Sequence, residues 1–335
     1  MLVLGIETSC DETSVSVVEN GKTILSNIVS SSLSLHKKYG GVIPEIASRA
    51  QLEFIYPAAC QALKKAKVSI GDIGLVSVTY GPGLNGSLLV GLSFAKAISF
   101  AQNIPLIGID HLKAHLYAPL LCQKVGFPFV GLVVSGGHTS LFLVKDFDNF
   151  TLLGQTVDDA AGEAFDKVAK ILGLSYPGGP LIEKIALRGN PKMRFSCGNL
   201  EKKFDFSFSG IKTAVLYHTK GCALCAMRYA QTTRRKTHQA DIAYAFQEAV
   251  FDDIAKKSIL ACVMKKTNSL VVGGGVASNK RLRQKLHHLA SLHNIKVYLA
   301  KSEYCLDNAA MVAGLGYRLY KKGIISNLTL NTKPT

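Results

Sequence analysis

Two histidines separated by four positions offer the clearest chemistry in the chain. They are His111 and His115, in the segment IDHLKAHLYAPLL. In a helix, side chains at i and i+4 lie on one face about 6 Å apart, close enough for both imidazoles to bind one metal ion. A zinc-protease helix has Glu directly after the first histidine, whereas Leu112 follows here, so hydrolysis of peptides by that route is not expected. Two buried histidines without a metal explain the spacing equally well.

Acidic residues in glycine-rich or apolar settings are the other reactive candidates. Asp11 and Glu12 lie in a polar turn after the first apolar run, where either can accept a proton or bind a metal. Asp307 precedes an Ala/Gly-rich helical segment and can serve there as the N-cap. As a third ligand beside His111 and His115, it would instead complete a two-histidine, one-carboxylate site with open positions.

Three glycine-rich turns follow apolar strands, in the segments SGGHT from Ser135, GPGLNGS from Gly81 and GGGVASN from Gly273. Glycines at the end of a strand let backbone N–H groups approach an anion, although tight turns require glycine in any case. No turn has the P-loop pattern or a dinucleotide-binding pattern. Together the three turns favour a nucleotide-type ligand.

The elements that must position these residues occur twice. Residues 2–18 and 129–144 both read as strand, polar turn and strand, offset by 126 positions. Residues 75–100 and 269–292 both read as strand, glycine-rich loop and helix. Alternating strands and helices predict an α/β fold, here two similar lobes with a cleft between them that holds the ligand. We expect a lobe at 1–127 with the histidines and the first turn, a basic lobe at 128–335, and helices at 46–65 and 240–257.

Positive charge is concentrated in the second half. The formal net charge is +16; residues 1–125 carry 10 basic and 8 acidic side chains, and residues 126–335 carry 29 and 15. No acid occurs between Asp205 and Asp241 or between Asp253 and Glu303. Six cations lie in the first stretch: Lys212, Lys220, Arg228, Arg234, Arg235 and Lys236. The second holds ten, including Lys280, Arg281, Arg283 and Lys285. Such asymmetry predicts a surface for a polyanion, with nucleic acid as the leading candidate.

Composition also bounds the cellular context. Eight cysteines without framework spacing indicate reduced thiols in a cytosolic protein. Cys222 and Cys225 form a C-x-x-C, but no second pair follows at zinc-ribbon spacing. Met1 leads directly into a strand-like run followed by acids, so no signal peptide is expected. No run approaches the ~18 apolar residues of a membrane span.

Nine ordered motifs then identify a family. They are GIETSCDETSVSVV, GGVIPEIASRAQ, GPGLNGSLLVG, HLKAHLYA, VSGGHTSL, DDAAGEAFDKVAK, YPGGP, FSFSGIKTAV and GGGVASN. The chain resembles the tRNA threonylcarbamoyladenosine transferase family, in its bacterial TsaD branch, from about residue 2 to residue 322. The resemblance implies the duplicated actin/sugar-kinase/Hsp70-like (ASKHA) fold, which agrees with the internal repeat.

The resemblance also implies a reaction. The family transfers a threonylcarbamoyl group from threonylcarbamoyl-adenylate to N6 of the adenosine immediately 3′ of the anticodon, in tRNAs reading codons that begin with A, and AMP leaves. His111, His115 and Asp307 match its ligands for one divalent metal ion, Fe²⁺ or alternatively Zn²⁺. Matching substrate-binding positions are Val134, Ser135, Gly136, Gly137, His138, Asp166, Gly179, Glu183 and Asn279. Many relatives have Asp in place of Glu183, so this chain has a longer acid at that contact.

We assign proton transfer to Asp11 or Glu12, because the exocyclic amine of adenosine must lose a proton as it is acylated. The resemblance implies tRNA as the partner, together with a paralogous, inactive TsaB-like subunit and a small TsaE-like ATPase. Three other interpretations compete with this one. A metal-dependent glycoprotein endopeptidase would lack its Glu at position 112, a sugar-kinase-like ATPase would not need the histidine pair, and a non-catalytic tRNA-binding subunit would not need His111, His115 and Asp307 together.

Overall fold

The computed structural model of the chain describes all residues except 191–192, 199 and 227–231, and it leaves the side chains of residues 220–226 and 232–237 undescribed. The chain forms two compact units. Unit 1 contains Met1–Val125, Asp146–Phe150 and Ala300–Thr335, and unit 2 contains Gly126–Lys145 and Thr151–Leu299. Among the described residues, no helix has both the length and the apolar character needed to cross a membrane.

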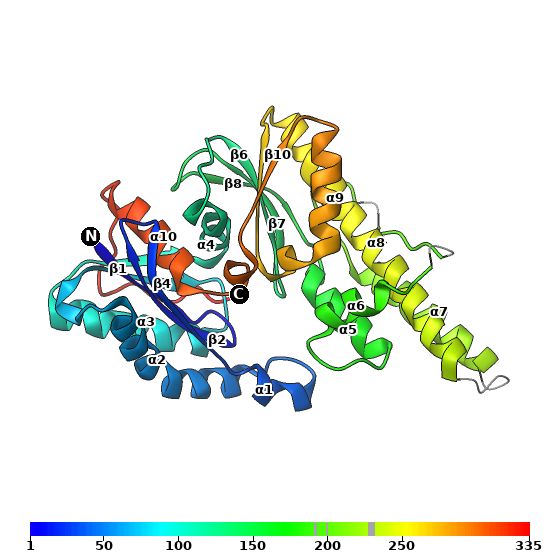
Figure 1. Cartoon of the computed structure of the whole chain (residues 1–335), viewed down its shortest axis with the longest axis horizontal. Helices are drawn as coiled ribbons and strands as arrows, with labels where there is room; N and C mark the ends of the chain where they lie inside the picture. Colours follow the sequence, from blue (N-terminus) through cyan, green and yellow to red (C-terminus); the bar gives the residue numbers. More distant parts are fainter. Residues whose placement is uncertain (191–192, 199, 227–231) are drawn as a thin grey trace. The chain divides into compact units, whose positions relative to one another are not determined.

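Unit 1 is built on a five-stranded sheet in the order β3-β2-β1-β4-β5 (Figure 1). The central strand β1 is antiparallel to β2 and parallel to β4, which is parallel to β5. The strands are β1 Leu2–Glu7, β2 Glu12–Glu19, β3 Thr23–Ser31, β4 Ile73–Gly81 and β5 Leu106–Asp110. The helices are α1 Leu33–His36, α2 Pro44–Ala66, α3 Asn85–Gln102, α4 His111–Tyr117 and α10 Ala309–Tyr320.

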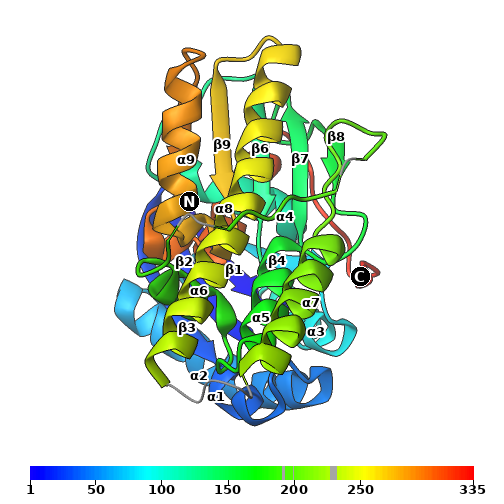
Figure 2. The same ribbon diagram turned by 90° about the vertical axis from the view of Figure 1, so that its right-hand side faces the viewer.

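Unit 2 repeats this topology, with a five-stranded sheet in the order β10-β9-β6-β7-β8. Its central strand β6 is antiparallel to β7 and parallel to β9, as β1 is to β2 and β4. The strands are β6 Phe129–Val134, β7 Thr139–Val144, β8 Phe150–Gln155, β9 Ser269–Gly273 and β10 Lys296–Leu299. The helices are α5 Ala161–Ile171, α6 Gly178–Ala186, α7 Ser209–Ala226, α8 Thr232–Met264 and α9 Lys280–Ser291 (Figure 2). The predicted duplication is therefore confirmed strand by strand.

The two faces of the first sheet are covered by different helices. Leu4 and Ile6 of β1 belong to the core cluster that includes residues of α2 and α3. Gly5 points to the opposite face, because successive residues of a strand alternate, and a Cβ at Gly5 would lie 2.2 Å from the carbonyl oxygen of Ala309 in α10. Helix α10 thus approaches β1 more closely than any side chain at position 5 would allow.

The core of unit 2 joins its sheet to α5, α6, α8 and α9. Three phenylalanines bridge α5 and α8: the ring of Phe165 stacks on Phe251 with centroids 5.2 Å apart and meets Phe246 edge-on at 4.9 Å. All three side chains are buried. Aromatic pairs at these distances contribute beyond the burial of their area, so α8 is fixed firmly against α5.

The expected helices at 46–65 and 240–257 are present within α2 and α8, and α8 is longer than expected. The division of the chain after Val125 lies close to the expected boundary at Phe127-Pro128. The last segment differs from expectation, because Ala300–Thr335 belongs to unit 1 although we placed it in the second lobe. The reason is that α10 buries an entirely apolar face, from Ala309 to Gly316, against the first sheet.

Candidate functional site

Helix α4 carries both histidines and begins directly after β5. Asp110 caps it by accepting a hydrogen bond from the backbone N–H of Lys113 at 3.1 Å, which satisfies one of the free donors of the first turn. His111 and His115 are buried, with 5% and 0% of their surfaces exposed. Their ring centroids are 4.5 Å apart, so the i, i+4 spacing does place the two imidazoles side by side.

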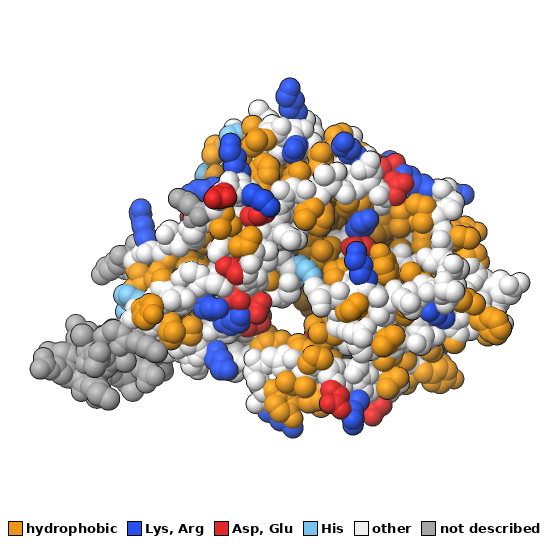
Figure 3. Space-filling model, turned by 180° about the vertical axis from the view of Figure 1, so that it is seen from behind, with side chains coloured by type: hydrophobic (Ala, Val, Ile, Leu, Met, Phe, Trp, Pro, Cys, Tyr) orange, Lys and Arg blue, Asp and Glu red, His pale blue; other side chains and the backbone are white. Residues whose placement is uncertain are grey.

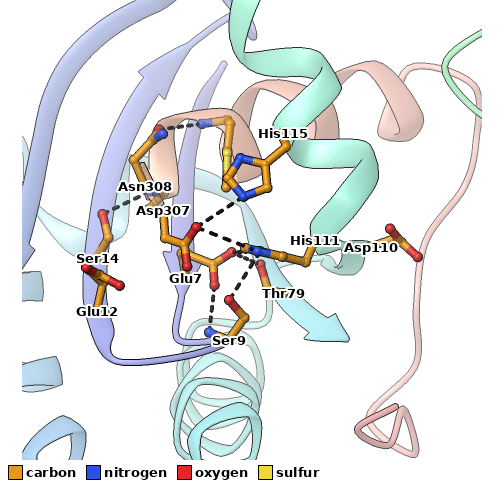
Figure 4. Close-up of polar contacts among 12 residues, drawn as sticks. Glu7, Ser9, Glu12, Ser14, Thr79, Asp110, His111, His115, Asp307 and Asn308 are labelled. Carbon is orange, nitrogen blue, oxygen red and sulfur yellow. Dashed lines mark hydrogen bonds and ion pairs between the residues drawn. The ribbon is translucent and has the colours of Figure 1, made fainter. Parts of the chain in front are cut away.

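Asp307 brings a carboxylate to this pair from the start of α10 (Figure 4). Its Oδ1 lies 3.1 Å from His115 Nε2 and 3.6 Å from His111 Nε2. The three potential ligand atoms lie within 4.8 Å of one another. Among the described residues, Nδ1 of His115 has no hydrogen-bond partner, and Nε2 faces the Asp307 carboxylate. Two imidazoles and a carboxylate suit Zn²⁺ and Fe²⁺, so the donor set fits a metal ion.

Asn308, not Asp307, is the N-cap of α10. The Asn308 side chain accepts a hydrogen bond from Met311 N at 3.1 Å and donates to the carbonyl oxygens of Tyr304 and Leu306. The alternative role that the sequence left open for Asp307 is therefore taken by its neighbour. This division of roles lets Asp307 face the histidines while α10 remains capped.

We expect Asn308→Ala to lower the free energy of unfolding by about 1–2 kcal/mol, the usual effect of removing an N-cap whose side chain is also buried and bonded. Urea denaturation monitored by circular dichroism measures this change. Asn308→Ser, which keeps a capping oxygen, should recover most of the loss. An Ala variant as stable as the wild type would contradict the capping role.

A buried carboxylate supports the histidine pair from β1. Glu7 is fully buried, and burial by itself would raise its pKa, but the charge of His111 and hydrogen bonds from His111 and Thr79 outweigh burial and lower the pKa. Burial conversely disfavours the charged form of His111, yet Glu7 and Asp307 raise the pKa of His111 to about 9. The pocket therefore attracts positive charge.

Two further carboxyl groups of unit 1, those of Asp11 and Glu12, lie at the turn between β1 and β2. Gln51 of α2 holds this turn by donating to the carbonyl oxygens of Cys10 at 2.9 Å and of Glu12 at 3.1 Å. Burial, with the negative charges of Asp307 and Asp11, raises the pKa of Glu12 to about 10. Burial and the neighbouring acids thus favour the protonated form of Glu12, and a positive charge nearby would lower its pKa.

Of the three glycine-rich turns, the one at Gly81–Gly86 lies against this first turn. Leu84 donates its backbone N–H to the Ser9 carbonyl oxygen at 2.8 Å. A Cβ at Gly83 would lie 2.4 Å from that same oxygen, so the close approach requires glycine.

The predicted substrate residues of unit 2 lie on a closed ring of two loops and the first turns of α5 and α6, beside the carboxyl ends of the parallel strands β6 and β9. We call it the loop ring; its segments are 134–138, 162–166, 178–183 and 274–280. The turn after Val134 accepts hydrogen bonds from α5: Gly162 N donates to the Ser135 carbonyl oxygen and Glu163 N to that of Gly136, both at 3.1 Å. A Cβ at Gly274 would lie 2.3 Å from the Val134 carbonyl oxygen, which joins the fourth segment to the first.

Side chains of the predicted residues close the rest of the loop ring. Asp166 accepts a hydrogen bond from Gly178 N at 2.7 Å, and burial raises its pKa despite this contact. Glu183 accepts from Lys280 N at 2.8 Å. Asn279 caps α9 by accepting from the backbone N–H groups of the two residues after Lys280, at 2.9 and 3.2 Å. Asp166, Glu183 and Asn279 thus already have structural partners within unit 2.

Comparison with known proteins shows to which family the chain belongs. The family model described as TsaD, tRNA N6-adenosine threonylcarbamoyltransferase, matches residues 23–314. The tRNA N6-adenosine threonylcarbamoyltransferase of Dictyoglomus turgidum is 48% identical over 335 residues, which span 100% of this chain and 98% of the relative. That of Thermosipho africanus is 49% identical over 337 residues, 100% of this chain and 99% of the relative. The chain belongs to the TsaD family.

Solved structures support the fold assignment for this TsaD-family chain. T. kodakarensis HypF has a TM-score of 0.63 at 16% identity, over 96% of this chain and 48% of HypF. Component A of the (R)-2-hydroxyglutaryl-CoA dehydratase of Acidaminococcus fermentans has a TM-score of 0.56 at 14% identity, over 97% and 100% of the two chains. At such identities the likeness concerns the fold alone. It confirms the duplicated ASKHA architecture.

Sequence reasoning missed several residues that surround the candidate metal site of this family member. Glu7 and Ser9 contact His111, Thr79 donates to Glu7, and Gln51 supports the turn after β1. One signal was available, because Glu7 is the only charged residue in the otherwise apolar run LVLGIE, and a charged side chain is rarely buried unless it is paired. Thr79 and Gln51 gave no such signal.

Cations in the two stretches of sequence without acids form ion pairs with acidic residues from other segments. Within unit 2, Glu248 of α8 pairs with Arg281 at 2.7 Å and with Lys285 at 2.9 Å, and Asp159 pairs with Lys212 at 2.6 Å. Unit 2 still carries 24 basic against 11 acidic side chains. On the described part of the face drawn in Figure 3, Lys and Arg side chains stand singly or in small groups. The excess charge is thus distributed and not gathered in one patch on that face.

Several residues named in the sequence analysis lie outside the described side chains. They are Cys222 and Cys225 of the C-x-x-C pair, with Lys220, Arg228, Arg234, Arg235 and Lys236 of the first basic stretch.

Proposed function

We propose that this chain transfers the threonylcarbamoyl group of threonylcarbamoyl-adenylate to N6 of the adenosine 3′ of the anticodon, in tRNAs that read codons beginning with A, and releases AMP. One observation carries the proposal. His111, His115 and Asp307 converge in a buried site, in a chain that matches the TsaD family over most of its length. A member that only binds tRNA would not need these ligands.

The reaction sets two demands on the site. N6 attacks the carbamoyl carbon, the bond from that carbon to a phosphate oxygen breaks, and AMP leaves with the electron pair. Negative charge therefore develops at the carbamoyl oxygen and at the phosphate, and N6 must lose a proton. Groups that hold developing charge in fixed positions supply the largest share of such catalysis, and a nearby base supplies the proton transfer.

His111, His115 and Asp307 would hold one divalent cation, Fe²⁺ or Zn²⁺, which when bound supplies Lewis acidity for the carbamoyl oxygen. Asp11 or Glu12 accepts the N6 proton. For Glu12 this requires that positive charge in the site first lower the pKa of about 10.

The loop ring supplies the adenylate contacts in this proposal, through Val134–His138, Asp166, Gly179, Glu183 and Asn279. A Cβ at Gly136 or Gly137 would meet nothing within 4 Å, so a phosphate has room to approach the backbone of this turn. The backbone N–H of Gly179 instead donates to the Asp166 carboxylate and helps to fix its position. Glu183 and Asn279, which also hold the start of α9, act mainly by fixing the ring's shape.

Partners follow from the same assignment. We propose that the chain works in the cytoplasm with tRNA, threonylcarbamoyl-adenylate, a paralogous TsaB-like subunit and a TsaE-like small ATPase. The charge of unit 2 supports tRNA as the polyanion.

The decisive experiment supplies chemically prepared threonylcarbamoyl-adenylate and an unmodified tRNA transcript to the purified chain, with and without the two protein partners. The digested nucleosides are then searched for threonylcarbamoyladenosine by mass spectrometry. No product in any arm and no tRNA binding would overturn the proposal.

Binding of tRNA should depend steeply on salt, because each neutralised phosphate releases about 0.7–0.9 counterions. Lys184, directly after the third segment of the loop ring, and Lys280, at the end of its fourth, are exposed cations. We expect Lys184→Glu/Lys280→Glu to weaken tRNA binding roughly tenfold, and to reduce the slope of log affinity against log salt by about 2. Fluorescence anisotropy with labelled tRNA at several salt concentrations measures both.

The matched control is Lys64→Glu/Lys65→Glu, which makes the same change in charge at the exposed end of α2 in unit 1. It should change affinity and slope much less. Equal losses in the two double variants would show that net charge, and not the loop ring, governs tRNA binding.

A further inference from the structure

Glu7 is a carboxylate held from several sides in the interior of unit 1. It ends β1 with none of its surface exposed. Its Oε1 accepts the Ser9 backbone N–H at 2.6 Å, and its Oε2 accepts the Thr79 hydroxyl of β4. Burying an ionised carboxylate is costly unless it is paired and hydrogen-bonded, and these donors come from the turn after β1 and from the neighbouring strand β4. The side chain of Glu7 therefore has one fixed orientation.

That orientation places Oε2 of Glu7 3.2 Å from Nδ1 of His111 (Figure 4). The Ser9 hydroxyl also lies 3.2 Å from Nδ1. A hydrogen bond to a carboxylate is roughly twice as strong as one to a neutral acceptor, so Glu7 is the dominant partner. The opposite nitrogen of the ring, Nε2, faces Asp307.

We propose that Glu7 is a positioning residue for the metal centre: by accepting the Nδ1–H of His111, it fixes the tautomer and ring orientation in which Nε2 is the ligand. Thr79 and the Ser9 amide fix Glu7 in turn. This inference rests on the proposed metal site at His111, His115 and Asp307. Carboxylates that accept the second N–H of a metal-binding histidine raise its basicity and fix its direction, and their loss typically weakens metal binding by about 10- to 100-fold.

The test is the affinity of the full chain for Zn²⁺, measured by competition with a chromophoric chelator. Glu7→Gln keeps the size of the side chain but offers an amide that can donate to Nδ1 and stabilise the wrong tautomer. We expect it to bind Zn²⁺ at least about tenfold more weakly. Thr79→Val should act in the same direction by releasing Glu7, and Thr79→Ser, which keeps the hydroxyl, should restore affinity.

Thr13→Val is the matched control for Thr79→Val. Thr13 is a buried threonine of β2 whose hydroxyl has no hydrogen-bond partner among the described residues. The control should leave Zn²⁺ affinity unchanged. Circular dichroism melting of the metal-free proteins identifies any variant that is only destabilised.

A second measurement reports the tautomer itself. In Zn²⁺-loaded wild type labelled with ¹⁵N-histidine, the His111 ring should show a proton on Nδ1, and in Glu7→Gln this signal should weaken or disappear. A folded Glu7→Gln that binds Zn²⁺ as tightly as the wild type, with the same ring signal, would overturn the proposed role of Glu7 but not the metal site. A wild type that binds no Zn²⁺ would overturn the metal site and this inference together, whatever the outcome of the tRNA assay.

Discussion

His111→Ala should reduce the formation of threonylcarbamoyladenosine by about a thousandfold or more. The side chain is one of two imidazoles that converge on Asp307, and its loss leaves a two-residue site in a pocket that no longer fixes a cation. Lewis-acid stabilisation of a polarised carbonyl is worth several kcal/mol, and about 1.4 kcal/mol corresponds to a factor of ten in rate. Initial rates with saturating threonylcarbamoyl-adenylate and tRNA, quantified by mass spectrometry of the nucleosides, give this ratio.

His287→Ala is the matched control, because His287 is an exposed histidine of α9. It should retain full activity and full Zn²⁺ affinity. His111→Ala should keep tRNA affinity, since the proposed metal site lies in unit 1 and most of the excess charge lies in unit 2. Activity of the His111→Ala variant near the wild-type rate, in protein shown to be free of metal, would refute the catalytic role of this centre.

Gly5→Ala should strongly destabilise unit 1. The added Cβ would lie 2.2 Å from the carbonyl oxygen of Ala309 and 2.9 Å from the Cβ of Ala313. Both atoms belong to α10 and cannot rotate away, so the helix must move off the sheet. Overpacking of a rigid core costs about 1–3 kcal/mol and sometimes more; with a backbone atom as the obstacle, we expect a loss of about 3 kcal/mol in the free energy of unfolding.

This displacement should also weaken Zn²⁺ binding, because Asp307 lies just before α10. The control is Gly41→Ala, whose Cβ would meet nothing within 4 Å and which should change stability by no more than about 0.5 kcal/mol. Chemical denaturation and Zn²⁺ competition measure the two effects. Wild-type stability in Gly5→Ala would mean that α10 is not seated tightly on β1.

The repeated strand–turn–strand and strand–loop–helix patterns were enough to predict two α/β lobes of one fold, because hydrophobic periodicity reports the local structure that each segment adopts. The spacing of His111 and His115 was likewise enough to place both rings on one face, since four residues make about one helical turn. Motif order identified the family. These features depend on residues that are close together in the sequence, so the sequence alone is enough to predict them.

Contacts between distant segments were decided only by the tertiary structure. Asp307 meets the histidines because α10 returns to the first sheet, and that return also moves the last segment out of the lobe to which its position assigned it. Glu248 and Asp159 reach cations whose own stretches contain no acid, so the basic surface is smaller than composition indicates. Glu7 and Thr79 support His111 because β1 and β4 are neighbours in the sheet. Sequence spacing does not predict any of these pairings, because they depend on how strands and helices pack after the chain has folded.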